Sequence, residues 1–163
     1  MLTVEDQVVG DTVAWNFWSH AGVSLALTLA NFGSAYGTAK SGMGIASMSV
    51  TRPHLAFKGM VPVIMAGILS IYGLIVSILI AQNVKMGEVG TAGPALAAKA
   101  LSAGLACGLS QVFSGYAIGL VGEQGVISYG QNEAIFMALI LILIFAEVLG
   151  LYGMIIAIIL QLG

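Results

Sequence analysis

Charged residues are scarce in this chain of 163 residues, since lysine, arginine, aspartate and glutamate make up only 7% of it. Typical soluble domains carry about 25%, so the composition excludes an ordinary soluble protein. Cysteine occurs once, at Cys107, which excludes an internal disulfide framework and a four-ligand zinc site. We expect Cys107 to be a small, buried packing residue.

Basic clusters are also missing, and the net charge is −2. A nucleic acid is therefore not an expected partner. The N-terminus carries Glu5, Asp6 and Asp11 instead of the positive charges that begin a cleavable signal peptide, so we expect none. The sequence contains no glycine-rich phosphate loop, nucleophile elbow or His-Glu-x-x-His pattern. We predict that the chain is not an enzyme and holds no cofactor and no metal.

Hydrophobic residues, by contrast, make up 59% of the chain, and its mean hydropathy is +1.03. Four apolar stretches are long enough to cross a bilayer as helices; they are residues 13–39, 59–82, 100–121 and 134–160. The remaining segments are expected to be a short N-terminus and three loops, at residues 1–12, 40–58, 83–99 and 122–133. We therefore predict an all-α membrane protein with four transmembrane helices.

The positions of the positive charges predict the orientation in the membrane. The first loop is flanked by three of the five basic residues, which are Lys40, Arg52 and Lys58. The other two, Lys85 and Lys99, share the second loop with an acidic residue. Because positive charges are enriched on the cytoplasmic side, we expect the first loop to be cytoplasmic. Both termini and the 83–99 loop would then be lumenal.

The sequence is also an internal repeat. The shift that places Tyr36 on Tyr116 also places Tyr72 on Tyr152 and superimposes further identical residues in both halves. We infer two duplicated helical hairpins, residues 13–82 and 100–163. Since each repeat has two spans, both halves have the same topology, unlike inverted transporter repeats. The first helix of each hairpin is rich in small residues and the second in Ile and Leu, a taper that predicts a multi-subunit ring.

Small residues recur at four-residue spacing, which places them on one helical face where backbones can approach closely. Seven glycines are therefore predicted to be helix-packing positions. They are Gly33, Gly37, Gly67, Gly104, Gly108, Gly150 and Gly153.

Glu147 is the one acidic residue inside the last apolar stretch, midway between Glu133 and the C-terminus. At about 1.5 Å per residue it lies roughly 20 Å from either end. An acid at the bilayer centre costs at least about 2.5–3.5 kcal/mol, so we interpret it as a proton- or cation-exchanging carboxyl. The alternative is a structural hydrogen bond between helices. The equivalent position in the first half is Gly67, so the acid occurs once per chain.

Three hydroxyl side chains are candidate partners of this carboxyl: Tyr72, Tyr152 and Ser70. A sodium site would need several oxygen ligands, but the residues around Gly67 are apolar, and Gln111 lies nearer the middle of its span than such a site requires. Protons are therefore favoured over sodium, which stays an alternative. His20, near the end of the first span, is expected to have an interfacial or packing role.

Four motifs closely resemble the proteolipid (c-subunit) family of V-type proton ATPases. They are Ile-Phe-Ala-Glu-Val-Leu-Gly-Leu-Tyr-Gly at 144–153, Tyr-Gly-Thr-Ala-Lys-Ser-Gly at 36–42, Arg-Pro at 52–53 and Met-Ala-Gly-Ile at 65–68. The resemblance covers residues 21–160. It implies a ring-forming rotor subunit in vacuolar, endosomal or other acidic-organelle membranes, with Glu147 as proton carrier. The implied partners are other proteolipids, the stator a-subunit with its arginine, the d-subunit with the central stalk, and lipid.

One region departs from the family, which usually has an arginine and a Gln-Pro-Arg stretch before the last helix. This chain reads Gly-Val-Ile-Ser-Tyr-Gly-Gln-Asn-Glu-Ala at 125–134, which changes the expected contacts with the stalk. Two other function classes compete with a rotor subunit. A structural tetraspan assembly would tolerate loss of Glu147, and a cation-coupled secondary transporter would need more intramembrane polar groups than this chain has.

Overall fold

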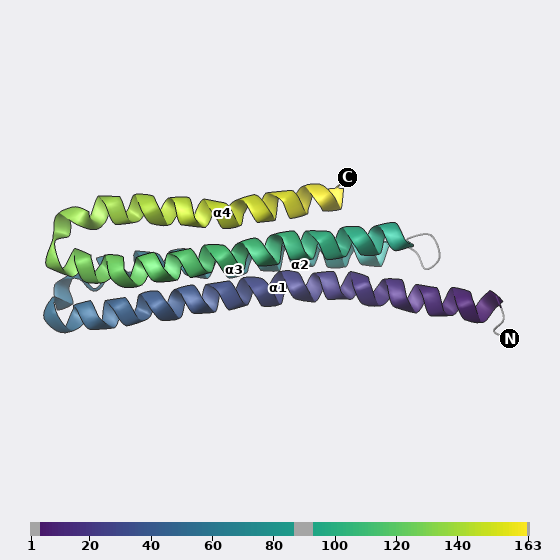
Figure 1. The fold of residues 1–163 in the computed structure, drawn as a ribbon, viewed down its shortest axis with the longest axis horizontal. Helices are drawn as coiled ribbons and strands as arrows, with labels where there is room; N and C mark the ends of the chain where they lie inside the picture. The colour runs from purple at the N-terminus through teal and green to yellow at the C-terminus, as the bar shows by residue number, and fades with distance from the viewer. Residues whose placement is uncertain (1–3, 87–92, 163) are drawn as a thin grey trace.

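The computed structural model describes residues 4–86 and 93–162, and in these residues four long helices lie side by side (Figure 1). They are α1 (Val4–Thr51), α2 (Val61–Met86), α3 (Pro94–Gln131) and α4 (Phe136–Leu162). Short 3-10 turns lie between them: η1 (Pro53–Leu55), η2 (Lys58–Met60) and η3 (Glu133–Ile135). The all-α prediction with four helices is confirmed. We call the end of the bundle that holds η1, η2 and η3 the turn end. The start of α1 and the end of α4 lie toward the opposite end of the bundle, which we call the terminal end (Figure 1).

The helices are longer than predicted, because α1 has 48 residues and α3 has 38. At 1.5 Å per residue, α1 is about 72 Å long, more than twice the hydrocarbon thickness of a bilayer. The predicted loops at 40–58 and 122–133 are wrong over most of their length, since residues 40–51 and 122–131 are helical. The reason is that a charged residue ends burial in lipid but does not end a helix. Lys40 instead pairs with Glu123 at 3.2 Å between α1 and α3.

The predicted 83–99 loop is also shorter than expected, because α2 continues to Met86 and α3 begins at Pro94. Residues 87–92, in the middle of that prediction, lie outside the described part of the chain.

Helices α1 and α3 end at the turn end because of the residues that follow them. Arg52 precedes a proline and leaves the helical region, with φ −137° and ψ 76°, because the proline ring clashes with a helical residue before it. Asn132 is extended, and its side chain accepts a hydrogen bond from the Ala134 N–H at 3.0 Å. This bond starts η3, so that only a short connection separates α3 from α4.

Three of the described segments are long and apolar enough to cross a membrane: Lys58–Val84, Pro94–Gln131 and Glu133–Leu162. Helix α1 is not among them, although residues 13–39 are predicted as a span. Its many small residues give it a lower hydropathy than the other helices, and it lies beside α3 through most of their length (Figure 1). That α1 is the fourth span stays a prediction.

Helices α1 and α3 touch through their backbones along a line of glycines, which we call the α1–α3 seam (Gly22, Gly33, Gly44, Gly104 and Gly115). A Cβ added at Gly33 would overlap the carbonyl of Gln111, and one at Gly115 would overlap the carbonyl of Gly33. The glycines recur at every eleventh position in each helix, a period of 3.67 residues per turn that keeps them on one face. This period was missed in the sequence, where only four-residue spacing was considered.

The seam also shows the internal repeat in space. Tyr36 and Tyr116, which occupy equivalent positions in the two repeats, stack with ring centroids 5.3 Å apart. The first helices of the two hairpins therefore lie parallel with equivalent positions facing each other.

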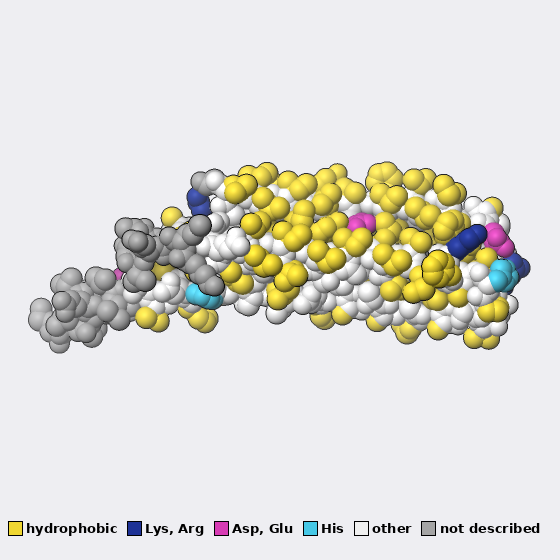
Figure 2. All heavy atoms as spheres, turned by 180° about the vertical axis from the view of Figure 1, so that it is seen from behind, with side chains coloured by type: hydrophobic (Ala, Val, Ile, Leu, Met, Phe, Trp, Pro, Cys, Tyr) yellow, Lys and Arg dark blue, Asp and Glu magenta, His cyan; other side chains and the backbone are white. Residues whose placement is uncertain are grey.

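Large apolar side chains cover the outside of the bundle (Figure 2), many of them on α2 and α4, including Ile64, Leu74, Phe145 and Ile159. Charged side chains gather near the ends in this view, apart from one acidic patch midway along the apolar surface (Figure 2). Such a surface suits contact with hydrocarbon.

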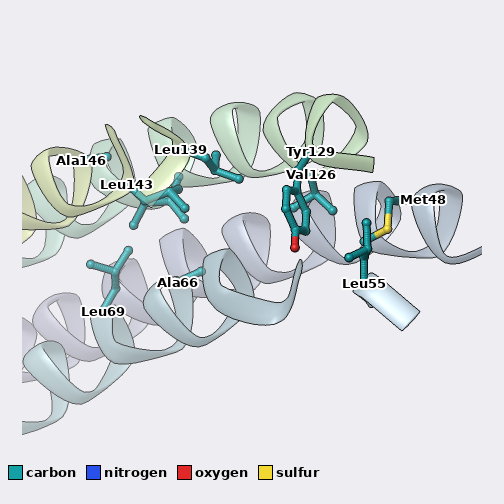
Figure 3. Packing of buried hydrophobic residues seen from close by; sticks show 10 residues of the cluster. Met48, Leu55, Ala66, Leu69, Val126, Tyr129, Leu139, Leu143 and Ala146 are labelled. Carbon is teal, nitrogen blue, oxygen red and sulfur yellow. The ribbon is translucent and has the colours of Figure 1, made fainter. Parts of the chain in front are cut away.

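The interior holds two clusters of buried hydrophobic side chains. One joins all four helices near the turn end, through Met48, Leu69, Val126 and Leu143 among others (Figure 3). The other lies nearer the terminal end and contains Cys107, which is completely buried. The prediction that Cys107 is a buried packing residue is confirmed.

Candidate ion-carrying site

Glu147 lies in the middle part of α4, between Phe136 and Leu162. At about 1.5 Å per residue it is roughly 16 Å from the first of these residues and roughly 22 Å from the second. It is half-buried, and its neighbours differ: Ala146 is buried against the bundle, whereas Phe145 is 72% exposed. The carboxyl therefore lies at the border between the packed face of α4 and its exposed apolar face.

Tyr72 of α2 reaches this carboxyl, since its hydroxyl donates a hydrogen bond to Glu147 Oε1 at 3.3 Å. Tyr72 is thus the one predicted partner that the structure brings to the acid. Ser70 donates to the Gly67 carbonyl of its own helix at 2.8 Å. Tyr152 is 58% exposed, and its ring lies on the outside of the bundle.

Two side chains of α3 bind the backbone of α4 on either side of Glu147. The Ser114 hydroxyl donates to the Ala146 carbonyl at 2.7 Å, and Gln111 Nε2 donates to the Gly150 carbonyl at 2.9 Å. Both side chains are completely buried. Sequence reasoning missed these contacts, and it considered Gln111 only as an ion ligand. The available signal was a pair of polar residues one turn apart in a helix of small and apolar residues.

Glycines allow α3 to come this close to α4. A Cβ at Gly150 would lie 2.5 Å from Gln111 Oε1 and 3.2 Å from Ser114 Oγ. One at Gly153 would overlap the Ser110 hydroxyl.

Four of the other five predicted packing glycines lie at close helix contacts. Gly33 and Gly104 lie in the α1–α3 seam, while Cβ atoms at Gly37 and Gly108 would each come within 2.9 Å of a neighbouring helix. Gly67 differs, because nothing in the described structure lies within 4 Å of its added Cβ. Its packing role stays a prediction that could concern only a neighbouring chain or lipid.

No group of three His, Cys, Asp or Glu side chains that could hold a metal ion occurs within residues 4–86 and 93–162. His20 Nδ1 lies 2.7 Å from the Asn16 carbonyl of its own helix, and the side chain is exposed. That His20 has an interfacial or packing role stays a prediction.

Comparison with known proteins identifies the family. A profile of the ATP synthase C-subunit family matches residues 21–80 and again residues 101–160. The chain is 50% identical over 146 residues to the V-type proton ATPase 16 kDa proteolipid c-subunit of Bos taurus, covering 90% of this chain and 92% of that protein. The chain belongs to the V-type ATPase proteolipid family. The second profile match follows the first at the same offset as Tyr116 follows Tyr36, which confirms the predicted duplication.

Fungal V-type ATPase proteolipids are equally similar. The c-subunit of Candida tropicalis is 49% identical over 145 residues, covering 89% of this chain and 88% of that protein. The c′-subunit of Candida glabrata is 50% identical over 145 residues, covering 89% of this chain and 87% of that protein. V-type ATPase c proteolipids are rotor subunits of the membrane sector and form a ring there. This chain is accordingly a multi-pass membrane proteolipid and not a catalytic subunit of the ATPase.

Proposed function

We propose that Glu147 is the proton carrier of this rotor subunit. The observation that carries the proposal is the position of the carboxyl: it is the one acid in the middle of α4, half-buried, at the border of an exposed apolar surface. A membrane helix rarely retains such a costly group unless it has a function. The duplicated hairpin has glycine at the equivalent position, so each chain would carry one proton.

The proposed cycle follows from the environment of the carboxyl. Hydrocarbon disfavours a charge, so Glu147 would be protonated while it faces lipid. Beside the arginine of the stator a-subunit, the charged form would be favoured and the proton released toward the lumen. A cytoplasmic half-channel would then refill the site. Moving one proton against 100 mV costs about 2.3 kcal/mol, which ATP hydrolysis elsewhere in the complex would supply.

Tyr72 would hold the protonated carboxyl in place during rotation through lipid. Its hydroxyl is the one oxygen that hydrogen-bonds to Glu147 in the described structure. A sodium ion would instead need several oxygen ligands around the carboxylate, which supports the proton over sodium.

The proposed orientation places the turn end in the cytoplasm, with the d-subunit and the central stalk, and both termini in the lumen of an acidic organelle. Three positive charges support it, since Lys40, Arg52 and Lys58 all lie toward the turn end.

The test is Glu147→Gln in the assembled ATPase, measured as ATP-driven proton uptake into vesicles and normalised to the amount of ring. The matched control is Glu123→Gln, which removes an acid from a partly exposed pair with Lys40. We expect loss of uptake to background in the first variant and normal uptake in the second. Wild-type uptake with Glu147→Gln would refute the proposal and support a structural role for the acid.

Carbodiimide labelling of Glu147 in native membranes separates proton from sodium. These reagents modify a protonated carboxyl in an apolar setting. We expect labelling that persists well above pH 6 and is unaffected by sodium, whereas protection by sodium would indicate a sodium-carrying ring.

A further inference from the structure

Glu147 is held at its place by two side chains of another helix. We propose that Gln111 and Ser114 of α3 are positioning residues, which set the rotation and height of the α4 turn that carries Glu147. This inference rests on the proposed role of Glu147 and extends it to residues that do not themselves touch the carboxyl.

The two hydrogen bonds form a two-point attachment. Ala146 and Gly150 are four residues apart, so their carbonyls lie one above the other on the same strip of α4. Ser114 and Gln111 are three residues apart on α3 and face that strip, with bonds of 2.7 Å and 2.9 Å. A single bond would let α4 pivot around it, whereas two bonds a turn apart fix both its rotation and its translation.

The attachment is placed where rotation of α4 matters most. Glu147 lies between the two bonded carbonyls, at the border between buried Ala146 and exposed Phe145. Because successive residues of a helix differ by about 100° in direction, a rotation of a few tens of degrees would move the carboxyl into the bundle or out into lipid. Either movement would change its distance from the Tyr72 hydroxyl, now 3.3 Å.

The same stretch of α3 also reaches α2. The Cys107 thiol lies one turn from Gln111 and is 4.0 Å from the backbone carbonyl of Tyr72. Gln111 Nε2 is in turn 3.9 Å from the Cys107 sulfur. Thus α3 contacts both the helix that carries the acid and the helix that carries its hydrogen-bond partner.

Packing alone does not account for a glutamine here. Gln111 is completely buried, and its Oε1 atom has no hydrogen-bond partner within the described residues. Leaving a buried amide oxygen unpaired is unfavourable, and an apolar side chain of similar size would avoid it. The amide N–H nevertheless donates to the Gly150 carbonyl, and a Cβ added at Gly150 would lie 2.5 Å from Gln111 Oε1. Both helices are therefore adapted to this one bond.

The test uses the complete ATPase with the double substitution Gln111→Met and Ser114→Ala, which removes both donors and leaves the total side-chain volume nearly unchanged. The control is Ser110→Ala, whose hydroxyl donates to Cys107 of its own helix at 2.7 Å. Three quantities are measured: the amount and thermal stability of the ring, the pH midpoint of carbodiimide labelling of Glu147, and proton uptake per ring.

We expect rings at wild-type level, because the double variant removes an unpaired buried oxygen together with the bonds. The labelling midpoint should move by at least about half a pH unit, which is a threefold change in the protonation equilibrium. Proton uptake per ring should fall by at least the same factor, and Ser110→Ala should change neither quantity.

A wild-type midpoint and wild-type uptake per ring in the double variant would overturn the proposal. So would fewer rings that each transport normally, which is the result expected of a purely structural role. Should the double variant give no ring, Ser114→Ala alone is read in the same way. The labelling midpoint reports on the carboxyl itself, so it tests the positioning even where Glu147→Gln has refuted proton carriage.

Discussion

The α1–α3 seam allows a quantitative prediction for Gly33→Ala. An added Cβ would lie 2.8 Å from the Gln111 carbonyl carbon and 2.9 Å from Val112 Cα. Carbon atoms in contact are ordinarily about 3.5–4.0 Å apart, so the helices must separate by about 1 Å. Overpacking of this kind costs about 1–3 kcal/mol, and the upper value applies because backbone atoms cannot turn aside. The higher helix propensity of alanine offsets about 1 kcal/mol of this cost. The free energy of unfolding should therefore fall by about 2 kcal/mol.

The same substitution elsewhere in α1 should have the opposite sign. Nothing lies within 4 Å of a Cβ added at Gly42. Gly42→Ala should therefore raise the free energy of unfolding by about 1 kcal/mol, because alanine has the higher helix propensity.

The double variant Gly33→Ala/Gly115→Ala tests whether the two glycines share one contact. The Cβ at Gly115 would meet the Gly33 backbone itself, so one separation admits both methyl groups. We expect the free energy of unfolding to fall by only about 1 kcal/mol in the double variant, whereas additive effects would lower it by about 4 kcal/mol.

Thermal unfolding of detergent-purified rings measures these differences, with all variants compared under one set of conditions. Equal stability of Gly33→Ala and Gly42→Ala would show that the helices are not held at backbone distance. Additive losses in the double variant would show that Gly33 and Gly115 do not share one contact.

Three further predictions concern side chains. Tyr72→Phe should slow proton uptake per ring about threefold, since an interhelical bond in a membrane is worth about 0.6 kcal/mol on average, whereas Tyr152→Phe should have no effect. Cys107 is completely buried, so a maleimide should label it only after denaturation, and labelling of native rings would contradict the packing described above. Cysteines introduced at Phe57 and Leu162, which are 84% and 79% exposed at opposite ends, should react from the cytoplasmic and the lumenal side respectively. Reaction of both from one side, or in the reverse order, would refute the proposed orientation.

The sequence was sufficient for features that depend on composition and repetition. The shift of Tyr36 onto Tyr116 predicts two hairpins of equal topology, and the family profile matches residues 21–80 and 101–160 with that same offset. Glu147 could be singled out because an acid in an apolar stretch is conspicuous whatever the surrounding fold. The stacking of Tyr36 on Tyr116 required the structure, because equivalence in a repeat does not imply contact.

The ends of the helices could not be predicted in the same way. Hydropathy falls at Lys40 and at Gly122 and so predicts boundaries there, but hydropathy reports contact with lipid and not backbone conformation. The true ends are at Arg52 before a proline and at Asn132, which caps a turn.

The contacts of Gln111 and Ser114 were out of reach for a different reason. Which face of α3 meets α4 is decided by glycines on both helices and by the α1–α3 seam, so it depends on several elements at once. A sequence pattern places these residues on one face of a helix but does not say what that face contacts.

The α1–α3 seam has a mechanical consequence. Where two helices meet through side chains, a load can be absorbed by changes of rotamer. Along the seam the closest atoms are backbone carbonyls and Cα atoms, which have no rotamers to change. Torque applied to one helix at either end should therefore pass to the other with little lag, and the pair should twist as one stiff beam. Elastic energy stored between ATP hydrolysis and proton release would then have to reside outside this pair of helices.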